Sequence, residues 1–188
     1  MCEKMMPSKT PLKPRQNNFF SVCEACKLCC CNGARPPLTL KRVRAIQNFL
    51  RANGISLTSP FENRQYTFPK ETQDGYCIFF DKATSKCRIH PVKPETCVAG
   101  PVTFDINRQT GMIEWFLKTK KICSLARALY QDKKAFEEHA KSAKREILKL
   151  VNDLDSKALD AILIIEEPDT FKFGEDALNS RAAAKLRQ

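Results

Sequence analysis

A dense run of cysteines near the N-terminus constrains this chain more than any other feature of its sequence. The run is Cys23-x2-Cys26-x2-Cys29-Cys30-Cys31, and four distant cysteines follow it, Cys77, Cys87, Cys97 and Cys123. Two cysteines separated by two residues can bend around one ion, because a tight turn points both sulfurs to the same side. A third cysteine at the same spacing adds another thiolate from the same loop. The run therefore predicts a metal site.

The cysteine spacing leaves the metal open between zinc and an iron–sulfur cluster. Three close cysteines with one remote cysteine are common in 4Fe-4S sites, whereas zinc ribbons take one CxxC pair from each of two loops. This chain has no separate second CxxC pair, yet it also lacks the fourth local cysteine followed by proline of bacterial ferredoxins. The sequence accordingly predicts one or two centres of either type.

Length and composition favour one folded domain in a reducing compartment. The chain has 188 residues, of which 43% are hydrophobic and 28% charged, and these are ordinary values for a globular protein. No apolar run approaches the roughly 18 residues of a membrane span, and the first twenty residues do not resemble a secretory signal. We therefore expect a cytoplasmic protein with no membrane association, whose ten cysteines stay reduced and available for metal.

The formal net charge of +11 is concentrated toward the N-terminus. Residues 1–60 hold ten Lys and Arg against two acidic residues, whereas residues 101–188 hold sixteen against fourteen. Part of this excess offsets the negative charge of a thiolate site. No interleaving of aromatic and basic residues marks a nucleic-acid surface. We expect the protein to bind a metal ion or cluster. A protein partner is compatible with this pattern, and nucleic acid is not expected.

Hydrophobic periodicity predicts an α+β fold, in which a small cysteine-rich core with β-hairpins and an amphipathic helix precedes C-terminal helices. The first helix spans residues 38–53, with Thr39 as its N-cap and Gly54 just past its end. Its apolar face carries Leu40, Val43, Ile46, Phe49 and Leu50. The opposite face carries Lys41, Arg42, Arg44 and Arg51, which we interpret as a solvated face.

Two hairpins and a helical turn are predicted after an irregular segment over residues 55–75. Residues 76–80 form a strand that returns through 87–90, and residues 102–107 pair with 112–118. The short helical turn lies over residues 94–97, between the two hairpins.

The C-terminal part is predicted to be helical. A helix of about twenty residues begins near Asp132, and a second runs from a Ser156 cap to Glu167. The buried face of the long helix carries Phe136, Ala140, Ala143, Ile147, Leu150 and Val151. The tail from Phe171, with Ala182-Ala183-Ala184 between charges, is expected to be a frayed helix or disordered. The chain thus divides into a flexible basic arm (1–18), a cysteine-cluster metal-binding domain (19–125) and a helical extension that packs on it (126–188).

The cysteine pattern resembles that of the YkgJ-type cysteine-cluster proteins, a zinc- or iron-chelating family named for its CxxCxxCC motif. The same domain occurs in flagellin lysine N-methylases. The resemblance covers about residues 20–125 and rests on Cys23-Glu24-Ala25-Cys26-Lys27-Leu28-Cys29-Cys30, Tyr76-Cys77-Ile78-Phe79, Cys87-Arg88-Ile89-His90, Lys93-Pro94-Glu95-Thr96-Cys97 and Cys123. It implies eight metal ligands: Cys23, Cys26, Cys29, Cys30, Cys77, Cys87, Cys97 and Cys123. Cys2 and Cys31 lie outside the family pattern, and His90 stands where an aromatic residue is more usual.

The resemblance implies a metalloprotein with a structural or redox centre and leaves open whether the chain is an enzyme. The alternative it suggests is a metal-dependent enzyme similar to protein-lysine N-methyltransferases, which must bind a methyl donor. The chain has only six glycines and no glycine-rich turn from strand to helix, so a Rossmann-type donor site is not expected. His90 is either a reserve nitrogen ligand or a hydrogen-bonded histidine at a hairpin end, and the second is the simpler interpretation. His139 is assigned no role.

Overall fold

The structure is a computed structural model that describes residues 22–23, 26, 30–167 and 169–186. The predicted basic arm, Cys2 and Cys29 lie outside the described residues. In chain order the elements are α2 (Leu40–Ala52), β1 (Phe61–Asn63), β2 (Thr67–Pro69), β3 (Phe80–Asp81), β4 (Lys86–Cys87), the 3-10 helix η1 (His90–Val92), α3 (Glu95–Ala99), β5 (Val102–Asn107), β6 (Met112–Lys118), α4 (Ser124–Gln131), α5 (Lys133–Asp153), α6 (Ser156–Leu163), β7 (Thr170–Ala177) and α7 (Ser180–Lys185). Helices and small antiparallel sheets both contribute, which confirms the α+β class. Within the described part of the chain, no helix has the length and apolar character needed to cross a membrane.

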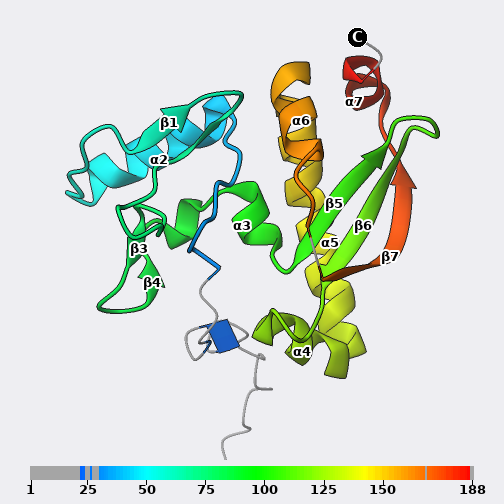
Figure 1. The fold of residues 1–188 in the computed structure, drawn as a ribbon, viewed down its shortest axis with the longest axis horizontal. Coiled ribbons are helices and arrows are strands. Elements are labelled where there is room, and N and C mark those ends of the chain that lie inside the picture. The colour runs from blue at the N-terminus through cyan, green and yellow to red at the C-terminus, as the bar shows by residue number, and fades with distance from the viewer. Residues whose placement is uncertain (1–21, 24–25, 27–29, 168, 187–188) are drawn as a thin grey trace, which may run out of the picture.

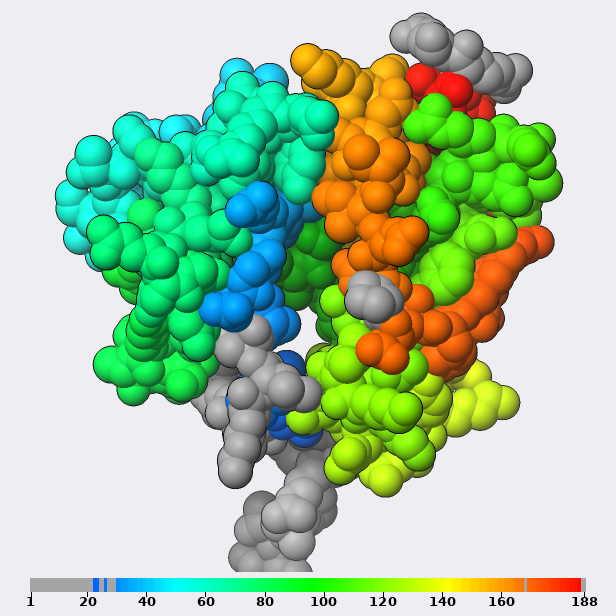
Figure 2. All heavy atoms as spheres, in the orientation of Figure 1, coloured from blue at the N-terminus to red at the C-terminus, as the bar shows by residue number. Residues whose placement is uncertain are grey.

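Two main hydrophobic cores divide the structure into halves with α3 between them (Figure 1). The α2 core consists of Leu38, Ile46, Leu50, Phe79 and Ile89. The sheet core joins the β5-β6-β7 sheet to the helices α4 to α7 and begins at Ala99, the last residue of α3. In Figure 2 the segment that follows the cysteine loop, drawn in blue, runs up the seam between the α2 half and the end of α6.

Helix α2 confirms the predicted helix and its caps. Thr39 Oγ1 accepts a hydrogen bond from the Arg42 backbone N–H at 3.1 Å, which satisfies one of the unpaired donors at the helix start. Gly54 follows the helix with φ +63°, a left-handed conformation that glycine adopts without strain. Ile46 is buried as predicted, but Leu40 is 75% exposed. The placement of Leu40 in the core was wrong, because this first helical residue lies beyond the edge of the α2 core.

Only very short strands occur in the cysteine-bearing α2 half. Strands β1 and β2 form a three-residue ladder inside the segment predicted to be irregular, so that prediction was wrong there. The predicted hairpin over 76–90 exists, but its strands β3 and β4 have two residues each. Tyr76 and Cys77 make only isolated bridges, with Asn32 and Glu71. This half is therefore held less by strand ladders than by loops and side chains.

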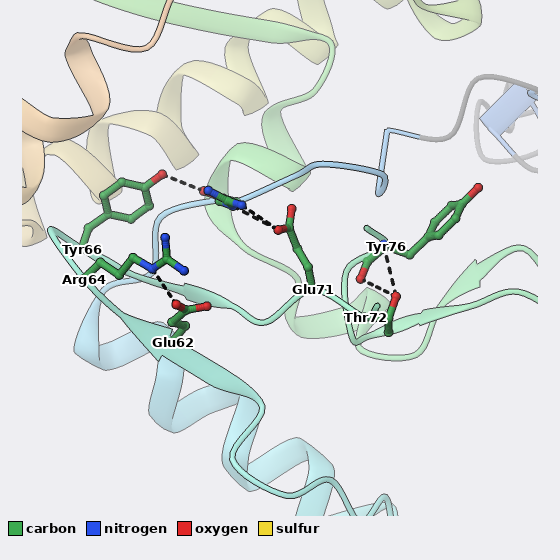
Figure 3. Close-up of polar contacts among 7 residues, drawn as sticks. Glu62, Arg64, Tyr66, Glu71, Thr72 and Tyr76 are labelled. Carbon is green, nitrogen blue, oxygen red and sulfur yellow. Dashed lines mark hydrogen bonds and ion pairs between the residues drawn. The ribbon is translucent and has the colours of Figure 1, made fainter. Parts of the chain in front are cut away.

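Polar side chains tie these loops together (Figure 3). The Arg35 guanidinium pairs with Glu71 at 2.9 Å, and the Tyr66 hydroxyl donates to the Arg35 carbonyl at 3.3 Å. Thr72 Oγ1 lies 3.1 Å from the Tyr76 carbonyl and accepts from the Tyr76 N–H at 3.2 Å. These contacts hold the chain after the cysteine loop against the segment that leads to Cys77.

The sheet core rests on a regular three-stranded sheet. Strands β5 and β6 pair from Val102↔Leu117 to Asn107↔Met112, which confirms the second predicted hairpin residue by residue. The tail prediction was wrong over residues 170–177, which form β7 on the free edge of β6. Its helical alternative is confirmed over the alanine run, because α7 covers Ser180–Lys185. The central strand carries Trp115, which is fully buried and donates its indole N–H to Asp176 in β7 at 2.6 Å.

The long helix α5 packs against this sheet, and it confirms the helix predicted to begin near Asp132. It begins at Lys133, directly after Asp132, whose Oδ1 accepts from the Ala135 N–H at 2.9 Å. The buried residues of α5 include all those predicted except Phe136, which is partly buried. Helix α4 was not predicted. Helix α6 is capped by Asp155 and not by Ser156. It ends at Leu163 rather than Glu167, because the next residue, Ile164, is 75% exposed and has no core to pack against among the described residues.

Candidate metal centre

Seven of the eight predicted ligands lie within the described residues, and Cys29 lies outside them. Within the described part of the chain, none of these seven cysteines is in a disulfide bond, as thiolate ligation of a metal requires. They come from the N-terminal loop, the β3–β4 region, α3 and the start of α4. Four segments of the described chain thus contribute the seven thiols.

The first part of the cysteine loop lies against the start of α4. Cys26 Sγ is 3.2 Å from Ser124 Oγ, although the two residues are 98 positions apart in the chain. Ser124 follows Cys123, which caps α4: its Sγ accepts from the Ala126 N–H at 3.4 Å. Cys26 and Cys123 therefore belong to one neighbourhood.

The end of the same loop lies against the β3–β4 hairpin. The Cys77 N–H donates to the Cys31 carbonyl at 2.8 Å, one residue after Cys30. The Phe80 N–H donates to the Cys77 carbonyl at 2.8 Å, and Phe80 pairs with Cys87 across the hairpin. These backbone bonds fix Cys77 and Cys87 beside the end of the loop.

Cys77 and Cys87 share a local arrangement that suits thiolate ligands. The backbone N–H of Phe79 bonds to Cys77 and lowers the pKa of its thiol, and the N–H of Ile89 acts in the same way on Cys87. In each case the donor lies two residues after the cysteine, and its side chain is buried in the α2 core. The core thereby anchors two short loops that direct N–H groups at sulfur. Such N–H groups stabilise negative charge on a ligand.

Burial opposes thiolate formation at several of these cysteines. Desolvation raises the pKa of Cys77 to about 11, and it also raises the pKa values of Cys23 and Cys87. The side chain of Cys97 touches solvent, yet protein atoms surround most of it, and desolvation raises the pKa of its thiol to about 12. These thiols hold their protons at neutral pH. A metal ion that binds them must displace those protons.

Mutual repulsion shows which thiols are neighbours. Cys30, Cys77 and Cys87 each raise the pKa of Cys97, in that order of strength. Cys30, Cys123 and Cys26 likewise raise the pKa of Cys23. Cys30 raises the pKa of both Cys97 and Cys23. The group near the β3–β4 hairpin and the group near the start of α4 therefore meet at Cys30.

A positive potential accompanies the thiols. A side-chain hydrogen bond with Cys31 is the main cause that lowers the pKa of Cys30 to about 6, and the charges of Lys118 and Lys93 add to it. Lys93 also lowers the pKa values of Cys23, Cys87 and Cys97. Cys30 therefore loses its proton more readily than an ordinary thiol, and the charge of Lys93 opposes the effect of desolvation at three further predicted ligands.

The donor set fits a soft or borderline metal held by thiolates, such as zinc or iron. Among the described residues, however, no three Cys, His, Asp or Glu side chains form a group that could hold a metal ion. The convergence of all eight cysteines on shared centres thus stays a prediction. His90 is exposed at the start of η1, and Cys31 contacts Cys30.

Comparison with known proteins supports the metal interpretation. Residues 22–139, well over half of the chain, match the family model described as CxxCxxCC: Putative zinc- or iron-chelating domain. The chain belongs to this family. The match confirms the family that the cysteine pattern suggested, and it includes α3, α4 and the first turns of α5. Comparisons with curated proteins and with solved structures gave no match.

Sequence reasoning missed the residues that surround the cysteines. Arg42 was assigned to a solvated face, but its Nε donates to the buried Glu95 at 2.8 Å. His139 was assigned no role, yet its Nε2 bonds to the Ala99 carbonyl at 3.1 Å. The position of Glu95 in the segment Lys93-Pro94-Glu95-Thr96-Cys97 was the one available signal, because a carboxylate so close to a ligand needs a partner when it is buried.

Proposed function

We propose that the protein is a zinc- or iron-binding metalloprotein whose cysteine thiolates hold one or two metal centres. The proposed ligands are Cys23, Cys26, Cys29, Cys30, Cys77, Cys87, Cys97 and Cys123. The centre has a structural role: it joins the N-terminal cysteine loop, the β3–β4 hairpin, α3 and α4. When bound, the metal supplies strong bonds to sulfur that no other group of this region replaces.

One observation carries the proposal: N–H donors and a cation stabilise negative charge on sulfurs that come from distant parts of the chain. Desolvation raises the pKa values of Cys77, Cys87, Cys23 and Cys97, and the N–H groups of Phe79 and Ile89 and the charge of Lys93 oppose this rise. The sulfurs also meet in space, because Cys26 lies against Ser124, beside Cys123, and the Cys77 N–H bonds to the Cys31 carbonyl, beside Cys30. Buried thiols used only for packing need no such donors. The family's zinc- or iron-chelating description points to the same chemistry.

The structural role follows from the weak secondary structure around the cysteines. The strands of the α2 half contain two or three residues each, and the cysteine loop reaches α4 through the Cys26 contact with Ser124. Ligation of structural zinc supplies on the order of 10 kcal/mol, which is comparable with the whole stability of a domain. A redox role is the second candidate, and the iron–sulfur-like spacing of Cys23, Cys26 and Cys29 favours it.

The proposal is tested by elemental analysis and a visible spectrum of the full chain purified without oxygen. We expect zinc without colour, or iron with sulfide and broad absorbance near about 400 nm if a cluster is bound. Cys26→Ser and Cys87→Ser are expected to lower both the metal content and the melting temperature. Cys2→Ser is the matched control, because Cys2 lies outside the eight-cysteine pattern. Unchanged metal-to-protein ratios in both ligand variants would contradict the proposal.

A further inference from the structure

Helix α3 carries Cys97 but is too short to fix the direction of that side chain by itself. It has five residues, and isolated helices of this length are not stable in water. Residues four apart lie on one face of a helix, so Glu95 and Ala99 share a face and Cys97 projects from the opposite one. The contacts of the first face therefore decide where Cys97 points.

At the start of α3, Glu95 is held by an arginine from the α2 half. The Glu95 side chain is 7% exposed, and its Oε1 accepts from Arg42 Nε at 2.8 Å. Arg42 Nη2 also reaches Glu146 of α5 at 3.5 Å. One guanidinium thus links α2, α3 and α5. The ion pair is largely shielded from solvent, so its geometry is well defined compared with that of a surface pair.

At the end of α3, Ala99 is held by a histidine from the sheet half. His139 Nε2 lies 3.1 Å from the Ala99 carbonyl, and a carbonyl only accepts, so this nitrogen carries the proton. Desolvation lowers the pKa of His139, which keeps the ring neutral at ordinary pH. Ala99 itself is fully buried in the sheet core. Both ends of α3 are therefore fastened, each by a residue from outside the cysteine loop.

We propose that His139 and the Arg42–Glu95 pair are positioning residues that direct Cys97 toward the metal. This inference rests on the proposed function, in which Cys97 is a ligand. They act through the backbone of α3 and do not touch the metal. Residues that orient metal ligands in this way typically contribute about 10- to 100-fold to metal affinity. If His139 and the Arg42–Glu95 pair only stabilise the fold, replacing them should lower stability equally whether residue 97 is cysteine or serine.

A double-mutant cycle between His139 and Cys97 separates these two roles. Zinc affinity is measured on the reduced full chain by competition with a chromophoric chelator. We expect His139→Leu to weaken zinc binding about 10- to 100-fold, and His139→Gln to recover most of the loss because its amide still donates to Ala99. In the Cys97→Ser background, His139→Leu should cause no further loss. Equal losses in both backgrounds would overturn the proposal.

A second measurement covers the case in which Cys97→Ser binds too little zinc for a cycle. Cobalt(II) replaces zinc, and the intensity of its sulfur-to-metal absorption reports how many thiolates bind. If Cys97 is one of four ligands of its ion, we expect His139→Leu and Arg42→Met to lower this intensity by about a quarter. Arg108→Ala is the control, because it removes a surface pair with Asp160 that lies in the sheet half. Unchanged intensity in both α3 variants would refute the proposal, whereas a wild-type protein without sulfur-bound metal would refute the proposed function itself.

Discussion

The two halves of this protein are stabilised in different ways. In the sheet half, strands of six to eight residues and the 21-residue helix α5 surround a closed core with Trp115 at its centre. In the α2 half, the strands have two or three residues, and the α2 core is small. Six of the seven described candidate ligands precede β5, and Cys123 alone follows the β5–β6 hairpin. The proposed function explains this difference, because metal bonds would take the place of extended strands in the α2 half.

Metal removal is expected to have the largest effect and to separate the halves. Chelation of the reduced full chain should destabilise the α2 half by on the order of 10 kcal/mol. Amide hydrogen exchange resolves the two regions: protection in α2 and β3–β4 should be lost, while β5, β6 and α5 keep theirs. Equal loss of protection across both halves would contradict the claim that the metal stabilises the α2 half and the hydrophobic core stabilises the sheet half.

A core truncation should produce the opposite pattern. Trp115→Ala removes a fully buried indole and its bond to Asp176, and we expect unfolding to become easier by about 3–5 kcal/mol. At temperatures where the variant is folded, its metal-to-protein ratio should equal that of the wild type. The control is Ile164→Ala, since this side chain is 75% exposed and its loss should change stability very little. Denaturant titration with metal analysis measures both quantities.

The Arg42–Glu95 pair tests the connection between the halves. Arg42→Met leaves the Glu95 carboxylate buried, with Oε2 already lacking a partner among the described residues, so we expect a cost of about 3 kcal/mol in the metal-bound protein. Replacing both residues, as Arg42→Met with Glu95→Met, should recover most of this stability. Chemical denaturation of the three proteins gives the comparison. If the double variant is as unstable as Arg42→Met alone, the ion pair itself stabilises the protein, and the loss in the single variant is not due only to an unpaired Glu95 carboxylate.

A small pH effect is expected from Asp176 in the sheet half. The hydrogen bond from Lys144 is the main cause that lowers the pKa of Asp176 below its usual 3.8, with Trp115 contributing. A lowered carboxyl pKa adds stability above the unfolded-state value and loses it as the pH falls through the folded-state value. The stability difference between wild type and Asp176→Asn should therefore be steady from about pH 5 to 7 and shrink below about pH 4. A constant difference down to about pH 2 would show that Asp176 acts only as a neutral hydrogen-bond acceptor.

Local sequence patterns predicted those elements that are stabilised locally. Thr39 and Gly54 bound α2, and Asp132 begins α5, because caps act within a few residues. The β5–β6 hairpin was predicted for the same reason. Strand β7 was missed because its partner Trp115 is nearly sixty residues away, and nothing in the tail itself specifies that pairing. The short ladders β1–β2 and β3–β4 depend on the loops that bring them together.

In the candidate site, too, sequence predicts the local features but not the contacts between distant residues. The spacing of Cys23, Cys26 and Cys29 predicts a metal-binding loop directly from the sequence, and the family match supports metal chelation. The effect of Lys93 on the cysteines is evident only from the three-dimensional structure. The same holds for the bonds of Arg42 to Glu95 and of His139 to Ala99, which depend on how α2, α3 and α5 pack together. A basic residue on a helix has no signature that distinguishes a solvated side chain from one that reaches a buried carboxylate 53 positions away.

X-ray absorption at the zinc and iron edges of the anaerobically purified full chain tests the central claim most directly. It reports the metal and the atoms bound to it in one measurement. The thiolate assignment predicts a metal whose first shell consists of sulfur alone, at about 2.3 Å for zinc. A first shell of nitrogen and oxygen, or a protein with neither metal above background, would contradict it.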